Sequence, residues 1–310
     1  MAEITAGLVK DLRSRSGAGM MDCKKALVET GGDIEAAVDW LRTKGLAAAA
    51  KKAGRVAAEG LVGLAVSGGA GAIVEVNSET DFVARNADFQ SFVKTAAELA
   101  LANDGDLETI LKSGYPGTDR TVEGEITQLI AGIGENIQFR RSAALSVEPG
   151  IVASYVHNAV APNLGKIGVL VGLASSADPA SLETLGKQLA MHIAATGPQA
   201  VGVDDLDSQL VAHERELLTQ QARQSGRPDH VIEKMVEGRL RKFFEDAVLT
   251  CQTWVIDGET RVSGVLEKAA ADLGTEISVS GFVRFRLGEG IERDDGDFAA
   301  EVAATAGSSA

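Results

Sequence analysis

The segment Asn77-Ser-Glu-Thr-Asp-Phe-Val-Ala-Arg-Asn86 lies between two stretches whose apolar residues repeat with different periods. Residues 71–76, Gly-Ala-Ile-Val-Glu-Val, are short and rich in β-branched side chains, which predicts a strand. After the segment, apolar residues recur at helical spacing: Phe89, Phe92, Val93, Ala96 and Leu99. The segment is therefore predicted to form a corner between a strand and a helix, where a rigid scaffold commonly presents functional side chains.

Phe82, in the middle of this segment, has two interpretations. It lies seven residues before Phe89 and in phase with the helix, so it could staple the helix to the sheet as an ordinary core residue. Alternatively, its ring projects from the corner and contacts another molecule. Periodicity alone favours the core interpretation.

The composition is that of a soluble globular protein with two or three domains. The chain has 310 residues, of which 45% are hydrophobic and 24% charged. No apolar run approaches the ~20 residues of a membrane span, no signal peptide is visible, and Cys23 and Cys251 show no CxxC spacing. We therefore expect a cytoplasmic protein that does not contact membranes.

The charge balance limits the class of partner. The net charge is −14, which argues against a direct nucleic-acid binder. A protein partner or a small substrate stays open.

The first part of the chain is predicted to be helical. Residues 1–45 form a compact three-helix unit, with Thr5 and Asp33 as N-caps and Gly45 as the end of the third helix. Residues 46–59 are rich in alanine and form a helical linker. This linker carries Lys51, Lys52 and Arg55, a basic triplet whose usual explanation is a solvated helix face.

Two α+β subdomains are predicted to follow, residues 60–147 and 148–206. The first contains a hairpin whose turn is rich in glycine, the corner described above, a polar stretch, a helix over 122–133 and a strand over 137–147. The second repeats the order of strands and helix over 151–157, 167–174 and 179–195. The similarity of residues 97–102 to residues 189–194 suggests an internal repeat.

The remainder is predicted to contain a helical hairpin, a return to the sheet and a short terminal module. Residues 207–249 read as an antiparallel coiled coil around a Ser-Gly-Arg-Pro turn. Residues 250–290 complete the second subdomain, and residues 291–310 form a C-terminal module with a helix over 298–304.

Motifs of catalysis and cofactor binding are absent from the sequence. The histidines show no metal-binding spacing, and no nucleophile elbow or nucleotide-binding fingerprint is present. We therefore expect neither an enzyme nor a bound metal or cofactor. His192 lies on an apolar helix and is expected to be a hydrogen-bonded histidine of the protein core. His157 ends a predicted strand, and an interaction role and a structural role stay equally open for it.

Several blocks together resemble the bacterial elongation factor Ts family. Three of them carry the resemblance: residues 12–27 (LRSRSGAGMMDCKKAL), residues 79–84 (ETDFVA) and residues 133–136 (IGEN) with Arg140 and Arg141. The similarity extends through residues 190–195, 234–239 and 289–293, almost end to end. The stretch between residues 102 and 121 and the loop near Pro162 look divergent, so no function is carried onto them.

The resemblance implies an α+β protein with a ubiquitin-associated-like N-terminal domain, a two-part core, a coiled-coil insertion and a C-terminal helix. It implies a guanine-nucleotide exchange factor that binds elongation factor Tu, with self-association in the complex. The residues at positions that displace magnesium from the partner are Thr80, Asp81, Phe82 and Val83. Those at partner-binding positions are Val9, Met20, Met21, Lys24, Ile133, Gly134 and His157. The alternative is an adaptor that binds a protein through its N-terminal helices without nucleotide exchange.

Overall fold

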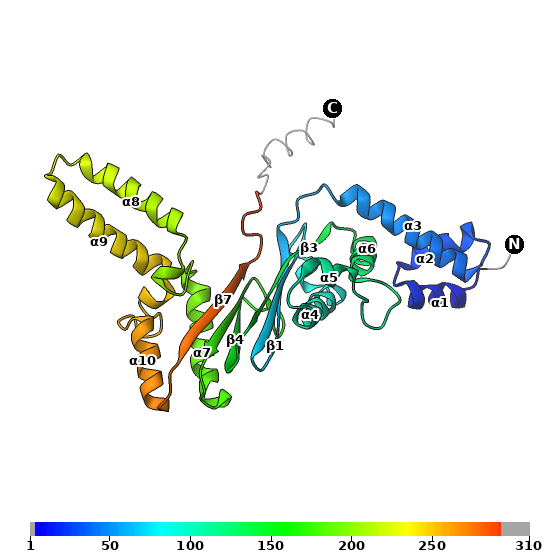
Figure 1. Cartoon of the computed structure of the whole chain (residues 1–310). Coiled ribbons are helices and arrows are strands. Elements are labelled where there is room, and N and C mark those ends of the chain that lie inside the picture. The colour runs from blue at the N-terminus through cyan, green and yellow to red at the C-terminus, as the bar shows by residue number, and fades with distance from the viewer. Residues whose placement is uncertain (1–3, 293–310) are drawn as a thin grey trace.

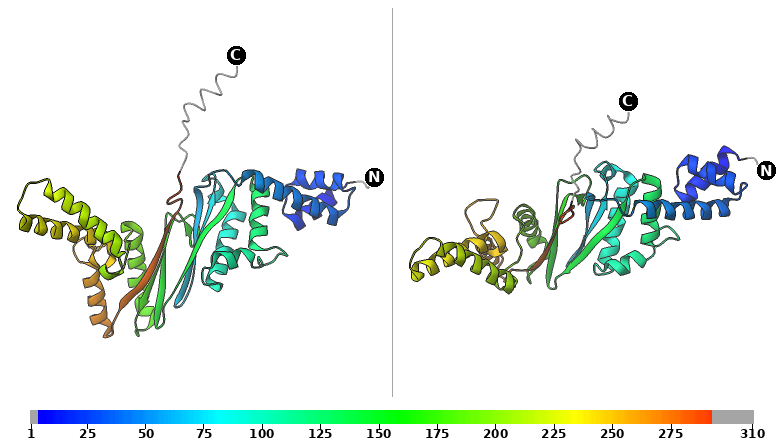
Figure 2. Two further views of the ribbon diagram at one scale, coloured as in Figure 1. Left: turned by 45° about the horizontal axis from the view of Figure 1, so that its top comes forward. Right: turned by 90° about the horizontal axis from the view of Figure 1, so that it is seen from above.

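The structure is a computed structural model and describes residues 4–292. Three helices lie at one end of an elongated molecule, two β-sheets occupy the middle, and a helical hairpin projects at the other end (Figure 1, Figure 2). The mixed helix and strand content confirms the predicted α+β class. The helix predicted over 298–304 lies outside the described residues.

The N-terminal unit consists of α1 (Ala6–Ser16), α2 (Met20–Glu29) and α3 (Ile34–Lys52). Thr5 caps α1 and Asp33 caps α3, as predicted. Its small core is formed by Val9, Leu12, Cys23, Ala26, Leu27 and Ala37.

The expectation that Gly45 ends the third helix is wrong, because α3 continues to Lys52. Gly45 instead lies against α6 (Val122–Ile133), where a Cβ atom on it would be 3.5 Å from Ala131 Cβ. Glycine costs helix propensity, but the packing of α3 against α6 keeps the helix continuous through this position. The side chain of Gln128 also donates a hydrogen bond to Ser16 O over 2.5 Å. The three-helix unit is thus packed directly on the core.

The first sheet has the strand order β3-β2-β1-β5. Its members are β1 (Glu59–Ser67), β2 (Ala70–Ser78), β3 (Ile137–Ser146) and β5 (Leu164–Gly165). The predicted glycine turn joins β1 and β2 through Gly68 and Gly69. The helices α4 (Ala87–Ala102), α5 (Leu107–Lys112) and α6 cover the outer face. Helix α5 was not predicted, because it is short and lies in a polar stretch. Ile110 is the only fully buried side chain of α5, so no apolar periodicity marks the helix.

The second sheet has the order β4-β6-β7, with β4 (Gly150–His157), β6 (Ile167–Ala174) and β7 (Ser278–Arg286). Helices α7 (Pro179–Thr196) and α10 (Val262–Leu273) pack on its outer face. Apart from α5 and β5, the order strand, strand, helix, later helix and strand is the same in both halves. In the corresponding triplets β3-β2-β1 and β4-β6-β7, β2 and β6 are the middle strands. This connectivity agrees with the predicted internal repeat.

The helical hairpin is formed by α8 (Ser208–Arg223) and α9 (Asp229–Ala247). Leu218, Ala222, Ile232, Val236 and Leu240 are buried between the two arms. At the base, Gln199 N–H donates to Ala247 O over 2.7 Å and Leu249 N–H donates to Ala200 O over 2.9 Å. The chain therefore leaves and re-enters the second half at one point, as expected for an insertion.

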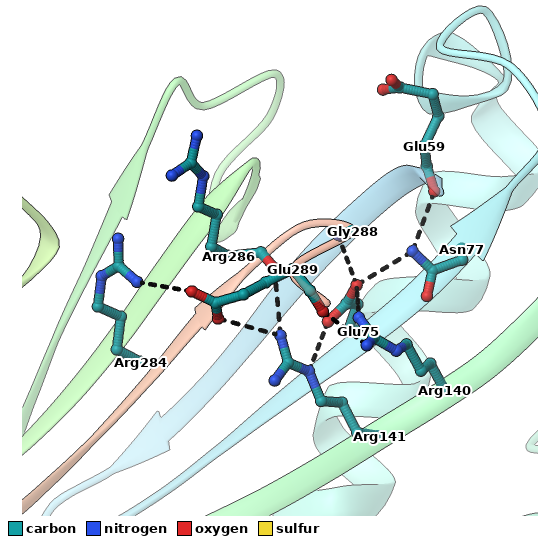
Figure 3. Close-up of polar contacts among 9 residues, drawn as sticks. All are labelled: Glu59, Glu75, Asn77, Arg140, Arg141, Arg284, Arg286, Gly288 and Glu289. Atoms are coloured by element: carbon teal, nitrogen blue, oxygen red, sulfur yellow. Dashed lines mark hydrogen bonds and ion pairs between the residues drawn. The ribbon is translucent and has the colours of Figure 1, made fainter. Parts of the chain in front are cut away.

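The inner faces of the two sheets pack on each other through Val62, Leu64, Ile73, Val152, Leu170 and Phe285. At one end this interface contains a fully buried carboxylate, Glu75 on β2 (Figure 3). Burying a charge is costly unless it is paired. Glu75 pairs with Arg140 Nη1 at 3.1 Å and Arg141 Nε at 2.5 Å, both on β3. It also accepts the N–H of Gly288 over 2.8 Å, which ties the chain after β7 to the first sheet.

Candidate functional site

The predicted corner begins where β2 ends, and Thr80 is its best-anchored residue. Its backbone N–H donates to Glu135 Oε2 over 2.9 Å, and its hydroxyl donates to Glu135 Oε1 over 2.6 Å. Its carbonyl oxygen accepts the hydroxyl of Ser78 over 2.9 Å. Glu135 follows α6, so a residue 55 positions further along the chain holds the start of the corner.

A further hydrogen bond joins residues 79–80 to residues 135–136, and this time the acceptor lies in the first of these segments. The carboxylate of Glu79 accepts the backbone N–H of Asn136 over 2.6 Å and lies 3.4 Å from Arg55 Nη1. The buried side chain of Asn136 donates in turn to Arg55 O over 2.8 Å. Arg55, part of the basic triplet, thus contacts both Glu79 and Asn136 and is not only a solvated side chain.

Past Thr80 the chain makes a short turn that presents Asp81 and Phe82 to solvent. Phe82 is 77% exposed, whereas Val83, the next residue, is 4% exposed and packs in the core of the first half. Asn86 then accepts the backbone N–H groups of Asp88 and Phe89, so a normal side-chain cap starts α4.

The interpretation of Phe82 as a core staple is therefore wrong for the isolated protein. Of the four residues predicted at the magnesium-displacing positions, Asp81 and Phe82 project and Val83 is inside. Single exposed apolar side chains are common, but this one is an aromatic ring on a turn that is braced from both sides.

Ile133 and Gly134 lie beside the corner because they immediately precede Glu135. Ile133 is half-buried against the core, and Gly134 adopts a φ of +88° that ends α6. A Cβ on Gly134 would be 3.7 Å from Lys52 Nζ. The exposed Gly134 backbone thus sits between the basic end of α3 and the corner.

His157 is exposed at the end of β4, with its Nδ1 3.3 Å from the hydroxyl oxygen of Tyr155. Lys166, whose N–H donates to His157 O, lies 3.8 Å from the carboxylate of Glu59. Glu59 pairs with Ser78 in the sheet register. His157 and the corner therefore lie at the same end of the core, although they belong to different sheets.

The N-terminal unit presents an exposed face of α2. Met20 and Met21 are 57% and 74% exposed, and Lys24 is also exposed one turn further on. Val9 differs from them because it is buried in the core of the three-helix unit. Val9 shapes this unit in the isolated protein but does not lie on its surface.

The outer surface of the hairpin is less apolar than its seam, with Leu210 and Leu217 partly exposed on α8. Self-association in the complex, which the family resemblance implies, stays a prediction. Within residues 4–292, no group of three or more His, Cys, Asp or Glu side chains is arranged to hold a metal ion. No helix in this range is both long and apolar enough to cross a bilayer.

Comparison with known proteins decides the family. The sequence profile of the family described as Elongation factor TS matches residues 79–289, a range that begins at the corner. The chain belongs to the elongation factor Ts family, and with it to the translation elongation factors. The resemblance seen in the sequence is thereby confirmed.

Curated relatives match over almost the whole chain. Elongation factor Ts of Rhodospirillum rubrum is 65% identical over 98% of this chain and 99% of its own length. The proteins of the same name from Parvibaculum lavamentivorans and Allorhizobium ampelinum are 58% and 54% identical, with 99% of both chains covered in each case. The similarity therefore includes the three-helix unit, which lies before the range of the family profile.

Sequence reasoning missed the roles of Glu79 and Glu135. Both lie in the blocks that carry the resemblance, but the sequence alone predicted no contact or role for either of them. An available signal was their placement, since Glu79 follows a predicted strand end and Glu135 follows the glycine that ends a predicted helix. Their partners, Thr80 for Glu135 and Asn136 for Glu79, lie 55 and 57 positions away in the chain, so only the fold brings them together.

Proposed function

We propose that this protein is a guanine-nucleotide exchange factor for elongation factor Tu. It binds the GDP-bound partner and promotes GDP release by disturbing the site that holds magnesium and the phosphates. It acts by binding, with no covalent chemistry and no cofactor of its own, in the cytoplasm. The observation that carries the proposal is the exposed Phe82 ring, adjacent to Asp81 on a turn braced by Glu135.

The energetics of this mechanism are those of negative coupling between two ligands on one partner. Each tenfold loss of GDP affinity requires about 1.4 kcal/mol of contacts that form only when GDP is loosened. Burying the Phe82 ring in a partner contributes about 2–3 kcal/mol, enough for roughly a 30- to 140-fold effect. The Asp81 carboxylate adds a charge that can compete in the oxygen ligand network of a magnesium ion.

A second contact area holds the partner while the corner acts. Met20 and Met21 offer adaptable apolar surface, and Lys24 can pair with an acidic side chain. Ile133, Gly134 and His157 extend the surface around the corner itself. This division assigns affinity to α2 and GDP release to the turn.

The adaptor alternative draws on the same exposed face of α2. The two functions differ in what happens to bound nucleotide. Elongation factor Tu loaded with a fluorescent GDP analogue is mixed with excess unlabelled GDP and increasing amounts of this protein. Exchange predicts a release rate that rises and saturates, whereas the adaptor predicts complex formation at an unchanged release rate.

A further inference from the structure

We propose that Glu135 is a positioning residue that holds the corner so that Asp81 and Phe82 meet the partner already in place. This inference rests on the exchange function proposed above. Glu135 binds both donors of Thr80, the residue immediately before Asp81, at 2.9 and 2.6 Å. It does not need to touch the partner to act.

The turn after Thr80 has little of its own to hold it. Three backbone hydrogen bonds run from the N–H groups of Ala84, Arg85 and Asn86 to the carbonyl oxygens three positions earlier. The side chain of Gln90 adds one more, to Ala84 O over 2.8 Å, but none of these bonds reaches a side chain of Asp81 or Phe82. Asp81 and Phe82 are exposed, so no packing of their side chains fixes the turn. The orientation of Asp81 and Phe82 is therefore set by their two neighbours, the buried Val83 and Thr80, which Glu135 holds. We call the two hydrogen bonds between Thr80 and Glu135 the clasp.

The internal repeat provides a comparison within the same molecule. In the second half, the corner after β6 is joined to the residue after α10 by a hydroxyl pair, Ser176 Oγ and Thr275 Oγ1 at 2.7 Å. Thr275 follows Gly274 as Glu135 follows Gly134, and both glycines end their helices with positive φ.

The two corners differ in length and in the group that clasps them. Two positions separate Ser176 from Asp178, the N-cap of α7, whereas six separate Thr80 from Asn86, the N-cap of α4. The four additional residues form the turn that carries Phe82. Where this turn is present, a carboxylate that accepts two hydrogen bonds stands in place of a single hydroxyl contact.

Pre-ordering of this kind raises rate and affinity because fewer side-chain and backbone states are lost on contact. Without the clasp, Phe82 would reach the same contact from a broader set of turn conformations. Hydrogen bonds to a charged acceptor are among the stronger ones. We expect their loss to slow GDP release about tenfold, which corresponds to about 1.4 kcal/mol.

The test compares Glu135→Ala, Thr80→Val and the double variant in the fluorescent-GDP release assay over a range of protein concentrations. Glu135→Ala is expected to lower the maximal release rate about tenfold, with a smaller change in half-saturating concentration because α2 is untouched. Thr80→Val removes only the hydroxyl contact and has a smaller effect. The double variant is no slower than Glu135→Ala, since both changes break the same clasp.

A readout independent of the partner is backbone amide exchange of Thr80 in the isolated protein. Its N–H donates to Glu135, so the exchange of this amide is faster in Glu135→Ala. Thr275→Val is the matched control, because it removes the equivalent contact of the other corner. It is expected to leave both the release rate and the Thr80 amide unchanged.

The outcomes separate this inference from the proposed function. If Phe82→Ala slows release but Glu135→Ala exchanges GDP at the wild-type rate, positioning by Glu135 is overturned and the exchange function stands. If Thr275→Val slows release as much as Glu135→Ala, the effect is one of general stability and the inference is again overturned. If the wild-type protein does not accelerate release at all, the exchange function fails and the positioning role fails with it.

Discussion

Gly288 donates its backbone N–H to Oε1 of Glu75 over 2.8 Å, although 213 positions separate the two residues. Glu75 lies on β2, an interior strand of the first sheet, and Gly288 follows β7 of the second sheet (Figure 3). Arg141 reinforces the link, since it pairs with Glu75 and stacks over the ring of Phe285 at 4.2 Å. This cluster connects the sheet that carries the corner to the sheet that carries His157.

The first prediction concerns the stability of this connection. Glu75→Ala leaves Arg140 and Arg141 without their buried partner, and removing one member of a buried pair is strongly destabilising. Because both arginines keep some contact with water, we expect a loss of about 3 kcal/mol in the free energy of unfolding, near the low end of the usual range. Urea unfolding followed by circular dichroism measures it.

The matched control is Glu35→Gln, which breaks the exposed pair between Glu35 and Arg15. Exposed pairs contribute about 0–1 kcal/mol. If Glu75→Ala lowered the free energy of unfolding no more than Glu35→Gln does, the structural role of the cluster would be contradicted.

The second prediction concerns Phe82. Phe82→Ala should leave the unfolding midpoint almost unchanged, within about 0.5 kcal/mol, because the ring is exposed and leaves no cavity. It should slow GDP release from elongation factor Tu by roughly one to two orders of magnitude, since the ring's burial in the partner is lost. Thermal unfolding and stopped-flow release are measured on the same preparations. A loss of several kcal/mol in stability with normal release would restore the core interpretation.

The third prediction concerns Asp81. Asp81→Asn preserves size and removes the charge, so release should slow less than in Phe82→Ala. The effect should grow with magnesium concentration, because the proposed role of the carboxylate is electrostatic and opposes a bound cation. Release rates are compared across a magnesium titration. A ratio of wild-type to variant rates that does not depend on magnesium would argue against this role.

The fourth prediction separates affinity from release. The double substitution Met20→Ala and Met21→Ala, and separately Lys24→Glu, should weaken complex formation with elongation factor Tu while the unit stays folded, because all three side chains are exposed. The saturating release rate should change little. Titration calorimetry measures affinity, and Val28→Ala, an exposed change on the same helix, is the control. Normal affinity in both variants would remove α2 from the contact surface.

The fifth prediction is a pH dependence of stability centred on His192. This side chain is buried, with its Nε2 2.9 Å from Gln252 Oε1 and its ring stacked 5.1 Å from that of Trp254. The N–H of Val255 donates to Nδ1 over 3.3 Å, so the ring is held in the neutral form with its proton on Nε2. Burial lowers the pKa of His192 below its ordinary value, and the hydrogen bond to Gln252 offsets part of this shift.

The direction of the pH dependence follows from the pKa of His192 in the folded and in the unfolded chain. The unfolded chain binds a proton at His192 near pH 6.5, whereas the folded chain binds it only at lower pH. The stability from neutral His192 is therefore complete above about pH 6.5 and is lost as the pH falls below it. Unfolding free energies measured between about pH 8 and 5.5 should decline for the wild type. His192→Gln should flatten this decline, whereas the exposed His213→Gln should not.

Much of the secondary structure could be predicted because it depends on neighbouring residues. The caps at Thr5 and Asp33 and the glycine turn between β1 and β2 are local features, and each was visible in the sequence. The corner itself was predicted from the change of period around Thr80. The same reasoning misplaced the end of α3, because Gly45 is a local helix breaker but its helix is stabilised by packing against α6.

The sequence by itself thus determined the order of the main elements, though not α5 or β5, together with the family and the location of the corner. Only the tertiary structure decided which side chains of the corner face outward. Phe82 and Val83 are adjacent and both apolar, and periodicity cannot tell that the first is exposed and the second buried. The contacts of Thr80 with Glu135 and of Glu75 with Gly288 likewise form only when distant segments meet. Local preferences set the backbone of each element, but partners far apart in the sequence are chosen by the path of the whole chain.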